Sequence, residues 1–228
     1  MIYSDERGIH MIYSDERKLS LSGWLRTNAF QEYCAPFKLQ KFLFFYEASA
    51  LADNLPFDFS HLSGYQRGPV FNNVWRDYTK ERPEFDSASI RAFSMYPEYT
   101  NEERAKKVAF IVKILSEAEL SELTHHMNIW RAKKDRIMNG KLQVTLEEKD
   151  FNDADRILVQ QLINRYPLSL IDDSDVIKLN NKYFVFSKSD IPKLEEQHYN
   201  VLAMLSEKEE LHNPVFVEVD DGGRLIVD

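Results

Sequence analysis

The sequence predicts an α+β fold, with a mainly α-helical part over residues 18–166 and a small antiparallel addition of β-hairpins and a helix over 167–228. In the first part, apolar residues recur at steps of three and four residues, as on the buried face of a helix. In the second part, short runs rich in β-branched and aromatic residues flank turn-forming pairs. The change of pattern at Pro167 places the boundary between the two parts.

The most apolar segment, residues 36–52, is expected to form the central helix. Leu39, Phe42, Leu43 and Tyr46 lie on one face, and further aromatic and alanine residues widen the apolar arc around nearly the whole helix. After a short loop, Gly68 permits a turn, and Pro69 is expected to begin a second helix. Its apolar face would carry Val70, Val74 and Tyr78, packed against the central helix.

The remaining helices are predicted from their caps. Thr100–Glu103 and Ser116–Glu119 both have the spacing of a capping box, and each should begin a helix. Asn128–Ile137 is expected to form another helix, and a last one should end before Pro167. Residues 81–99 show no clean period, which predicts a loop.

The C-terminal part is expected to have a ββαββ order. A hairpin is predicted over 176–186 around Asn180-Asn181, a helix over 190–207, and a second hairpin over 215–227 around 220–223.

The N-terminus carries an exact duplication. Residues 1–7 reappear unchanged as residues 11–17, and the second copy begins with its own Met11. A duplication of this kind indicates a cloning scar rather than a structural repeat. We therefore expect residues 1–17 to be disordered and residues 1–10 to be dispensable.

Composition excludes several classes of function. A formal net charge of −8 argues against nucleic-acid binding, which requires clustered Lys and Arg. The single cysteine, Cys34, cannot form an internal disulfide, which favours a reducing cytoplasm. The chain shows neither a signal peptide nor an apolar run of 18 residues, so we expect no membrane partner. No cofactor or metal is predicted.

The histidines do not form a catalytic pattern. His125 and His126 are adjacent, so on a helix they point about 100° apart and cannot hold one metal as an i, i+4 pair would. A cap or core role for His125 is therefore favoured over catalysis. Trp75 lies off the predicted helix face, and Arg67 and Arg76 flank the same turn, where they would supply a charged rim. These three residues are therefore a candidate interface with a protein partner.

Three segments together resemble the Panacea domain, also called the SocA-like antitoxin domain, across residues 20–166. The resemblance rests on the following residues and on their order in the chain: Lys38, Leu39, Gln40 and Lys41; Gly68, Pro69 and Val70; Leu123, Thr124, His125 and Trp130. It implies an antitoxin that binds a protein toxin, usually encoded beside it, and does no chemistry itself. Some relatives in this family instead act as adaptors that deliver the toxin to a protease. The C-terminal part would then help to choose the partner.

Two alternatives from other classes stay open. One is an enzyme of phage or bacterial origin with a cleft around His125, and the other is a prophage protein that interacts with the host. A homodimer is compatible with each of these functions.

Overall fold

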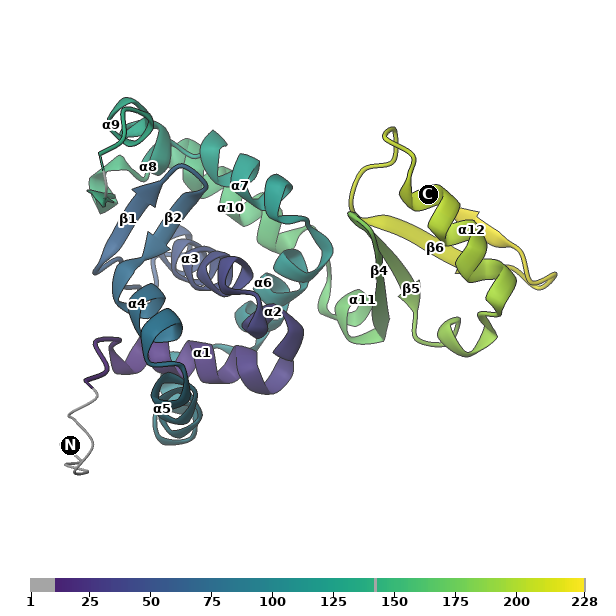
Figure 1. Ribbon diagram of the computed structural model, residues 1–228, viewed down its shortest axis with the longest axis horizontal. Helices are drawn as coiled ribbons and strands as arrows, with labels where there is room; N and C mark the ends of the chain where they lie inside the picture. The colour runs from purple at the N-terminus through teal and green to yellow at the C-terminus, as the bar shows by residue number, and fades with distance from the viewer. Residues whose placement is uncertain (1–10, 142, 228) are drawn as a thin grey trace.

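The computed structural model describes residues 11–141 and 143–227 and confirms the α+β fold (Figure 1). The helices are α1 Glu16–Asn28, α2 Phe30–Cys34, α3 Pro36–Ala52, α4 Asn72–Lys80, α5 Arg82–Met95, α6 Glu102–Ile114, α7 Glu117–His126, α8 Asn128–Arg131, α9 Lys134–Met138, α10 Asp153–Asn164, α11 Leu168–Asp173 and α12 Glu196–Ser206. The strands are β1 Leu62–Tyr65, β2 Gly68–Phe71, β3 Val144–Thr145, β4 Ser174–Leu179, β5 Lys182–Ser187, β6 Val215–Val219 and β7 Leu225–Val227. Over the described ranges 11–141 and 143–227, no helix is both long enough and apolar enough to cross a bilayer.

Helix α3 is the centre of the helical part, as the sequence predicts. Pro36 occupies its first turn, and nearly every later residue of the helix is buried. Helices α1, α6 and α10 pack around it (Figure 1). The Trp24 ring of α1 stacks on the Phe42 ring of α3 with centroids 5.8 Å apart, and this contact joins the two helices.

Pro69 lies in a strand, so the prediction of a second helix beginning there is wrong. Gly68–Phe71 pairs antiparallel with β1, and helix α4 begins only at Asn72. The strand order β2-β1-β3 places β2 at the edge of its sheet. An edge strand tolerates proline, because the missing N–H faces away from the neighbouring strand.

Residues 82–95 form helix α5, which corrects the prediction of a loop over 81–99. Pro83 lies in the first turn of the helix, where it breaks no hydrogen bond. The buried face consists of Phe85, Ala88, Ser89 and Ala92, and small residues of this kind give a weak apolar period. The backbones of α1 and α5 approach so closely at Gly23 that an added Cβ would collide with the Ser89 carbonyl.

The predicted caps hold in part. Ser116 and Glu119 form a complete capping box at the start of α7. Helix α6 is capped by Asn101 rather than Thr100, and the helix predicted over 128–137 is divided into α8 and α9.

Residues 11–17 belong to the fold, which corrects the prediction of disorder for the second copy of the duplicated heptapeptide. The backbone N–H groups of Tyr13 and Ser14 donate to Asp77 Oδ2 at 2.8 and 2.7 Å. Asp15 then caps helix α1 by accepting from the Lys18 N–H. The first copy lies outside the described residues.

The C-terminal sheet has the order β4-β5-β6-β7, and one of its strand pairs is parallel rather than antiparallel. Both predicted hairpins form as antiparallel pairs, but β5 and β6 run in the same direction. Helix α12 lies in the connection between these two strands, as a parallel pair requires. The expected antiparallel arrangement is therefore correct for each hairpin and wrong for the join between them.

The two faces of the C-terminal sheet have different partners. One face packs with α12 around a small core that includes Phe184, Phe186 and Leu202. The other face turns toward the helical part, where the ring centroids of Phe216 and Tyr166 lie 6.2 Å apart. Val185 on this face joins the main hydrophobic core. The sheet thus stands beside the helical part and touches it along one face (Figure 1).

Candidate functional site

The three segments that carry the family resemblance meet at one place, the turn between β1 and β2. This turn, Tyr65–Gly68, joins two strands that pair from Tyr65↔Gly68 onward. Side chains from α3, α7 and α8 surround it, although α3 lies far from α7 and α8 in the sequence. The turn is therefore the candidate functional site.

Trp130 and His125 hold the first half of the turn. Trp130 Nε1 donates to the Tyr65 carbonyl oxygen at 2.9 Å, and the His125 ring stacks on the Trp130 ring with centroids 3.9 Å apart. Burial lowers the pKa of His125, although its contact with the Gln66 backbone acts in the opposite direction. His125 Nε2 is buried and has no hydrogen-bond partner within the described residues. The imidazole therefore favours its neutral form.

Lys41 holds the second half of the turn from inside the core. Its side chain is buried, and its amine donates to the Arg67 carbonyl oxygen at 2.9 Å and lies 3.4 Å from Thr124 Oγ1. Thr124 Oγ1 donates in turn to the Ser121 carbonyl oxygen. Burial, with a smaller contribution from Arg67, holds the pKa of Lys41 well below its usual range. Lys41 therefore acts as a hydrogen-bond donor to the backbone and not as one half of an ion pair.

Gly68 closes the turn because no larger residue fits. Its φ of +104° lies in a region that favours glycine. An added Cβ would approach Lys41 Nζ and Thr124 Oγ1 to less than 3.0 Å, a separation that real Cβ atoms do not show. The absence of a side chain at Gly68 thus leaves the space that the ends of Lys41 and Thr124 occupy, and each of these residues comes from a different one of the three segments.

The other residues of the three segments have structural positions. Gln40 binds the backbone of Phe71, since its Oε1 accepts from the Phe71 N–H at 2.8 Å. Leu39 is buried in the main core, Leu123 packs against that core, and Pro69 and Val70 lie in β2 opposite Gly64 and Ser63.

Lys38 faces a different neighbour, the C-terminal part. Its amine donates to the Lys113 carbonyl oxygen at 3.1 Å and lies 4.6 Å from the centroid of the Tyr183 ring. Burial lowers the pKa of Lys38 to about 8. Two lysines three residues apart on α3 therefore have different roles: Lys41 supports the hairpin, and Lys38 supports the junction with the C-terminal sheet.

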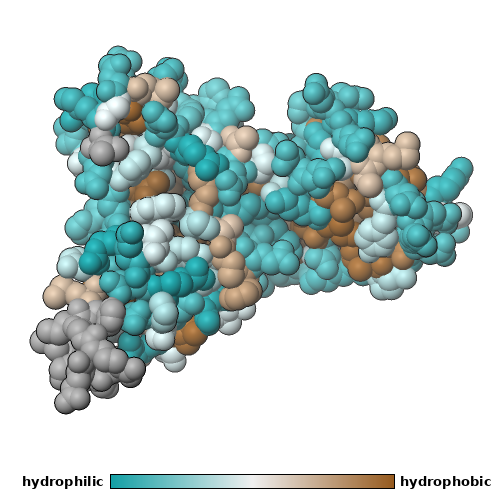
Figure 2. Space-filling view, viewed as in Figure 1, coloured by the Kyte–Doolittle hydropathy of each residue, from teal (hydrophilic) through white to brown (hydrophobic). Residues whose placement is uncertain are grey.

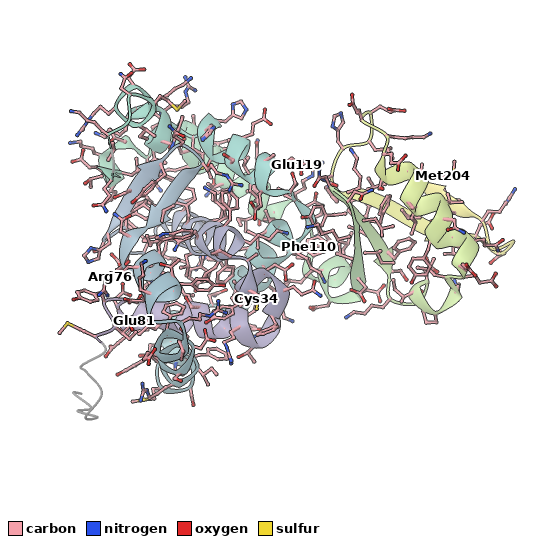
Figure 3. The ribbon with its side chains drawn as sticks, in the orientation of Figure 1. Cys34, Arg76, Glu81, Phe110, Glu119 and Met204 are labelled. Carbon is pink, nitrogen blue, oxygen red and sulfur yellow. The ribbon has the colours of Figure 1, made fainter. Side chains whose placement is uncertain are left out.

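The three residues of the predicted interface have different neighbours. The Arg67 guanidinium lies 4.4 Å from the Phe37 ring centroid and pairs with Glu117 at 2.6 Å. Arg76 instead stacks on Tyr13 at 3.8 Å, and Figure 3 places it on the side of the helical part away from the C-terminal sheet. Trp75 is 42% exposed. Arg67 is thus the member of this group that lies at the turn itself.

Sequence reasoning missed the polar junction between the two parts. Asn213 donates its amide to Glu119 Oε2 at 2.9 Å and accepts from the Tyr183 N–H at 2.8 Å. Figure 3 shows Glu119 at the edge of the helical part that faces the C-terminal sheet. The pairing joins residues 94 positions apart, and no local pattern could have indicated it.

Two cavities lie apart from the candidate site. A cavity of about 420 Å³ lies between α11 and the C-terminal sheet, and another of about 240 Å³ lies between α1, α6 and α11. Within residues 11–141 and 143–227, no group of three His, Cys, Asp or Glu side chains is placed to hold a metal ion.

No protein-family model, curated protein or solved structure matches the chain. The resemblance to the Panacea domain therefore stays a prediction that rests on the residues quoted for it.

Proposed function

We propose that the protein is an antitoxin that binds a protein toxin encoded beside it and neutralises that toxin by direct contact in the cytoplasm. The observation that carries this proposal is the convergence of the three family segments on the turn Tyr65–Gly68. In this arrangement Lys41, Thr124 and Trp130 contact the backbone or one another and leave the turn at the surface. Such an arrangement suits the display of a fixed surface to a protein partner.

The exposed side chains around the turn also suit a protein partner. Arg67 is 61% exposed along its side chain and rests on Phe37, and arginine held over an aromatic ring is common at interfaces. Delivery of the bound toxin to a protease would use the same contact. In that form, the protein would be an adaptor.

Co-expression of the neighbouring open reading frame tests the proposal. The neighbour alone should arrest growth, and this chain should restore growth and copurify with the neighbour's product. Purification after mild lysis, followed by size-exclusion chromatography, would give the stoichiometry and any homodimer. A neighbour that leaves growth unchanged and does not copurify would contradict the proposal.

One observation favours a second candidate, an enzyme that uses His125. The buried and unpartnered Nε2 of His125 is a group that an unidentified ligand could engage. His125→Ala separates the two functions, because it should abolish an enzymatic phenotype but leave toxin binding within about threefold of the wild type. A melting temperature measured for the same variant controls for loss of folding.

A further inference from the structure

The cavity beside α11 is a groove with an apolar floor and acidic walls. Val185, Phe216 and Ile226 belong to the face of the C-terminal sheet that α12 does not cover, and they line the groove of about 420 Å³. The polar part of its lining consists of three serines and two carboxylates: Ser169, Ser174, Ser187, Asp173 and Glu218. Ile226 is 50% exposed, which leaves a large apolar side chain open to solvent at the end of the groove.

The charge of the groove is unbalanced. Asp173 and Glu218 are exposed, neither carboxylate has a partner among the described residues, and the lining contains no Lys or Arg. The surrounding sequence has the same sign, since residues 167–228 hold 13 acidic and 6 basic residues, a net charge of −7 out of −8 for the whole chain. The groove is therefore electrostatically suited to a basic ligand.

The two edges of the sheet differ. At the β4 edge, the Val176 N–H donates to Asp175 Oδ1 at 2.8 Å. A side-chain contact of this kind opposes the pairing of a further strand with the edge. At the other edge, β7 pairs with β6 through Ile226↔Glu218 and has no strand on its outer side within the described residues. Strand addition is therefore favoured at β7 over β4.

The side chains of β7 specify what such a strand would carry. Leu225 and Val227 pack on the α12 side of the sheet, and Ile226 faces the groove. Alternate side chains of an added strand would lie on these same two faces. Apolar residues would extend the small core beside Leu225 and Val227. Lysine or arginine on the other face would lay its stem across Ile226 and place its charge near Glu218.

We propose that β7 and this groove are a docking site for an extended segment of the protein partner in which basic and apolar residues alternate. The proposal rests on the proposed function and adds a second contact with the partner, at β7, together with the chemistry of that contact. In this proposal the acidic C-terminal part selects the partner, because it recognises a basic strand of that partner.

Two variants test the site, each with a matched control. Glu218→Lys reverses a charge in the groove, and Glu210→Lys makes the same reversal at an exposed residue outside it. Ile226→Ser removes the exposed apolar side chain, and Met204→Ser does the same on α12, where Met204 is 71% exposed (Figure 3). Affinity for the neighbouring gene product should fall at least tenfold for both groove variants and stay within twofold for both controls.

A synthetic probe tests the groove independently of any toxin. A capped six-residue peptide of alternating lysine and valine should shift the amide resonances of Leu225, Ile226 and Val227 in an NMR titration of the full chain. A peptide of alternating glutamate and valine is the control. Glu218→Lys should remove the shifts produced by the lysine peptide.

The outcomes separate the two proposals. If the wild type neutralises its neighbour and the groove variants do so equally well, the docking site is wrong and the antitoxin function stands. If the neighbour is harmless but the lysine peptide shifts the β7 amides, the antitoxin function is wrong and the docking site stands. If the lysine peptide leaves the β7 amides unchanged, or acts no differently from the glutamate peptide, the docking site is overturned whatever the neighbour does.

Discussion

Asn213 donates its side-chain amide to Glu119 over 2.9 Å, and Glu119 is also the residue that closes the capping box of α7. Glu119 Oε2 accepts from the Ser116 N–H and hydroxyl as well, so one carboxylate oxygen fixes both the start of a helix and the junction with the C-terminal sheet. These hydrogen bonds hold the pKa of Glu119 below its usual range despite partial burial. Glu119 thus joins the helical part to the C-terminal sheet.

Asn213→Asp should loosen this junction. The substitution places a second carboxylate beside Glu119, so we expect the free energy of unfolding to fall by about 1–3 kcal/mol. Urea unfolding measures the loss, which comes from the amide donor to Glu119, since aspartate keeps the oxygen that accepts from the Tyr183 N–H. Asn200→Asp is the control, since it adds the same charge at an exposed position of α12. Equal effects of the two substitutions would show that the junction contact is unimportant.

Gly68→Ala should be among the most damaging small substitutions. It combines a φ of +104° with a collision against Lys41 and Thr124, so a loss of more than about 2 kcal/mol is expected in urea unfolding. Gly140→Ala is the matched control, because Gly140 has a φ of +80° with no atom within 4 Å of an added Cβ. That variant should lose only about 1 kcal/mol. A loss at Gly68 no larger than at Gly140 would contradict the described packing of the turn.

Lys38 should make the protein more stable as the pH rises above neutral. Its pKa is about 8 in the folded state and about 10.4 in the unfolded state, so between these values the unfolded state binds more protons. The free energy of unfolding should therefore rise between pH 8 and 10, by an amount on the order of 3 kcal/mol or less. Urea unfolding at pH 7.5, 8.5 and 9.5 measures the slope. Lys38→Met should reduce it, and an unchanged slope would show that Lys38 is not its source.

His125 should titrate below the usual range of histidine, because Trp130 and the turn bury it. An NMR titration of the ring C–H resonances gives its pKa directly. Trp130→Ala removes the stacked ring and should move the pKa of His125 upward, toward about 6.5. The same lowered pKa means that stability falls as the pH drops through about 6.5, since the unfolded state then takes up the proton first. A His125 resonance that titrates identically in both proteins would contradict the stacking.

The two copies of the N-terminal heptapeptide should differ in their contribution to stability. Removal of residues 1–10 should leave the melting temperature unchanged. Asp15→Ala removes the N-cap of α1 and should cost about 1 kcal/mol, whereas Asp5→Ala in the first copy should cost nothing measurable. Equal effects of the two alanine substitutions would show that the second copy has no special place in the fold.

The local patterns in the sequence were sufficient for some elements. Helix α3 is buried on nearly every side, as its continuous apolar composition requires, and Ser116 with Glu119 forms the predicted capping box. Both C-terminal hairpins form where β-branched runs and turn residues predict them. Helix α12 forms within the predicted range 190–207. In each case, residues within a few positions of one another carry the information.

The errors share a cause, which is that distant contacts override a local preference. Pro69 suits the first turn of a helix, but pairing with Gly64 makes it an edge strand. Residues 82–95 have a weak apolar period, yet close packing on α1 makes them a helix. Asp77 ties down residues 13 and 14 across more than 60 positions, which no pattern in a duplicated heptapeptide could indicate.

The sequence by itself determined the class of fold, the central helix and the residues that carry the family resemblance, because hydrophobic periodicity and caps are local properties. The tertiary structure alone decided where those residues meet. Lys41, Thr124 and Trp130 reach the same turn because β1 and β2 bring it between α3, α7 and α8. The groove beside β7 likewise exists only because α12 covers one face of the C-terminal sheet and leaves the other partly open.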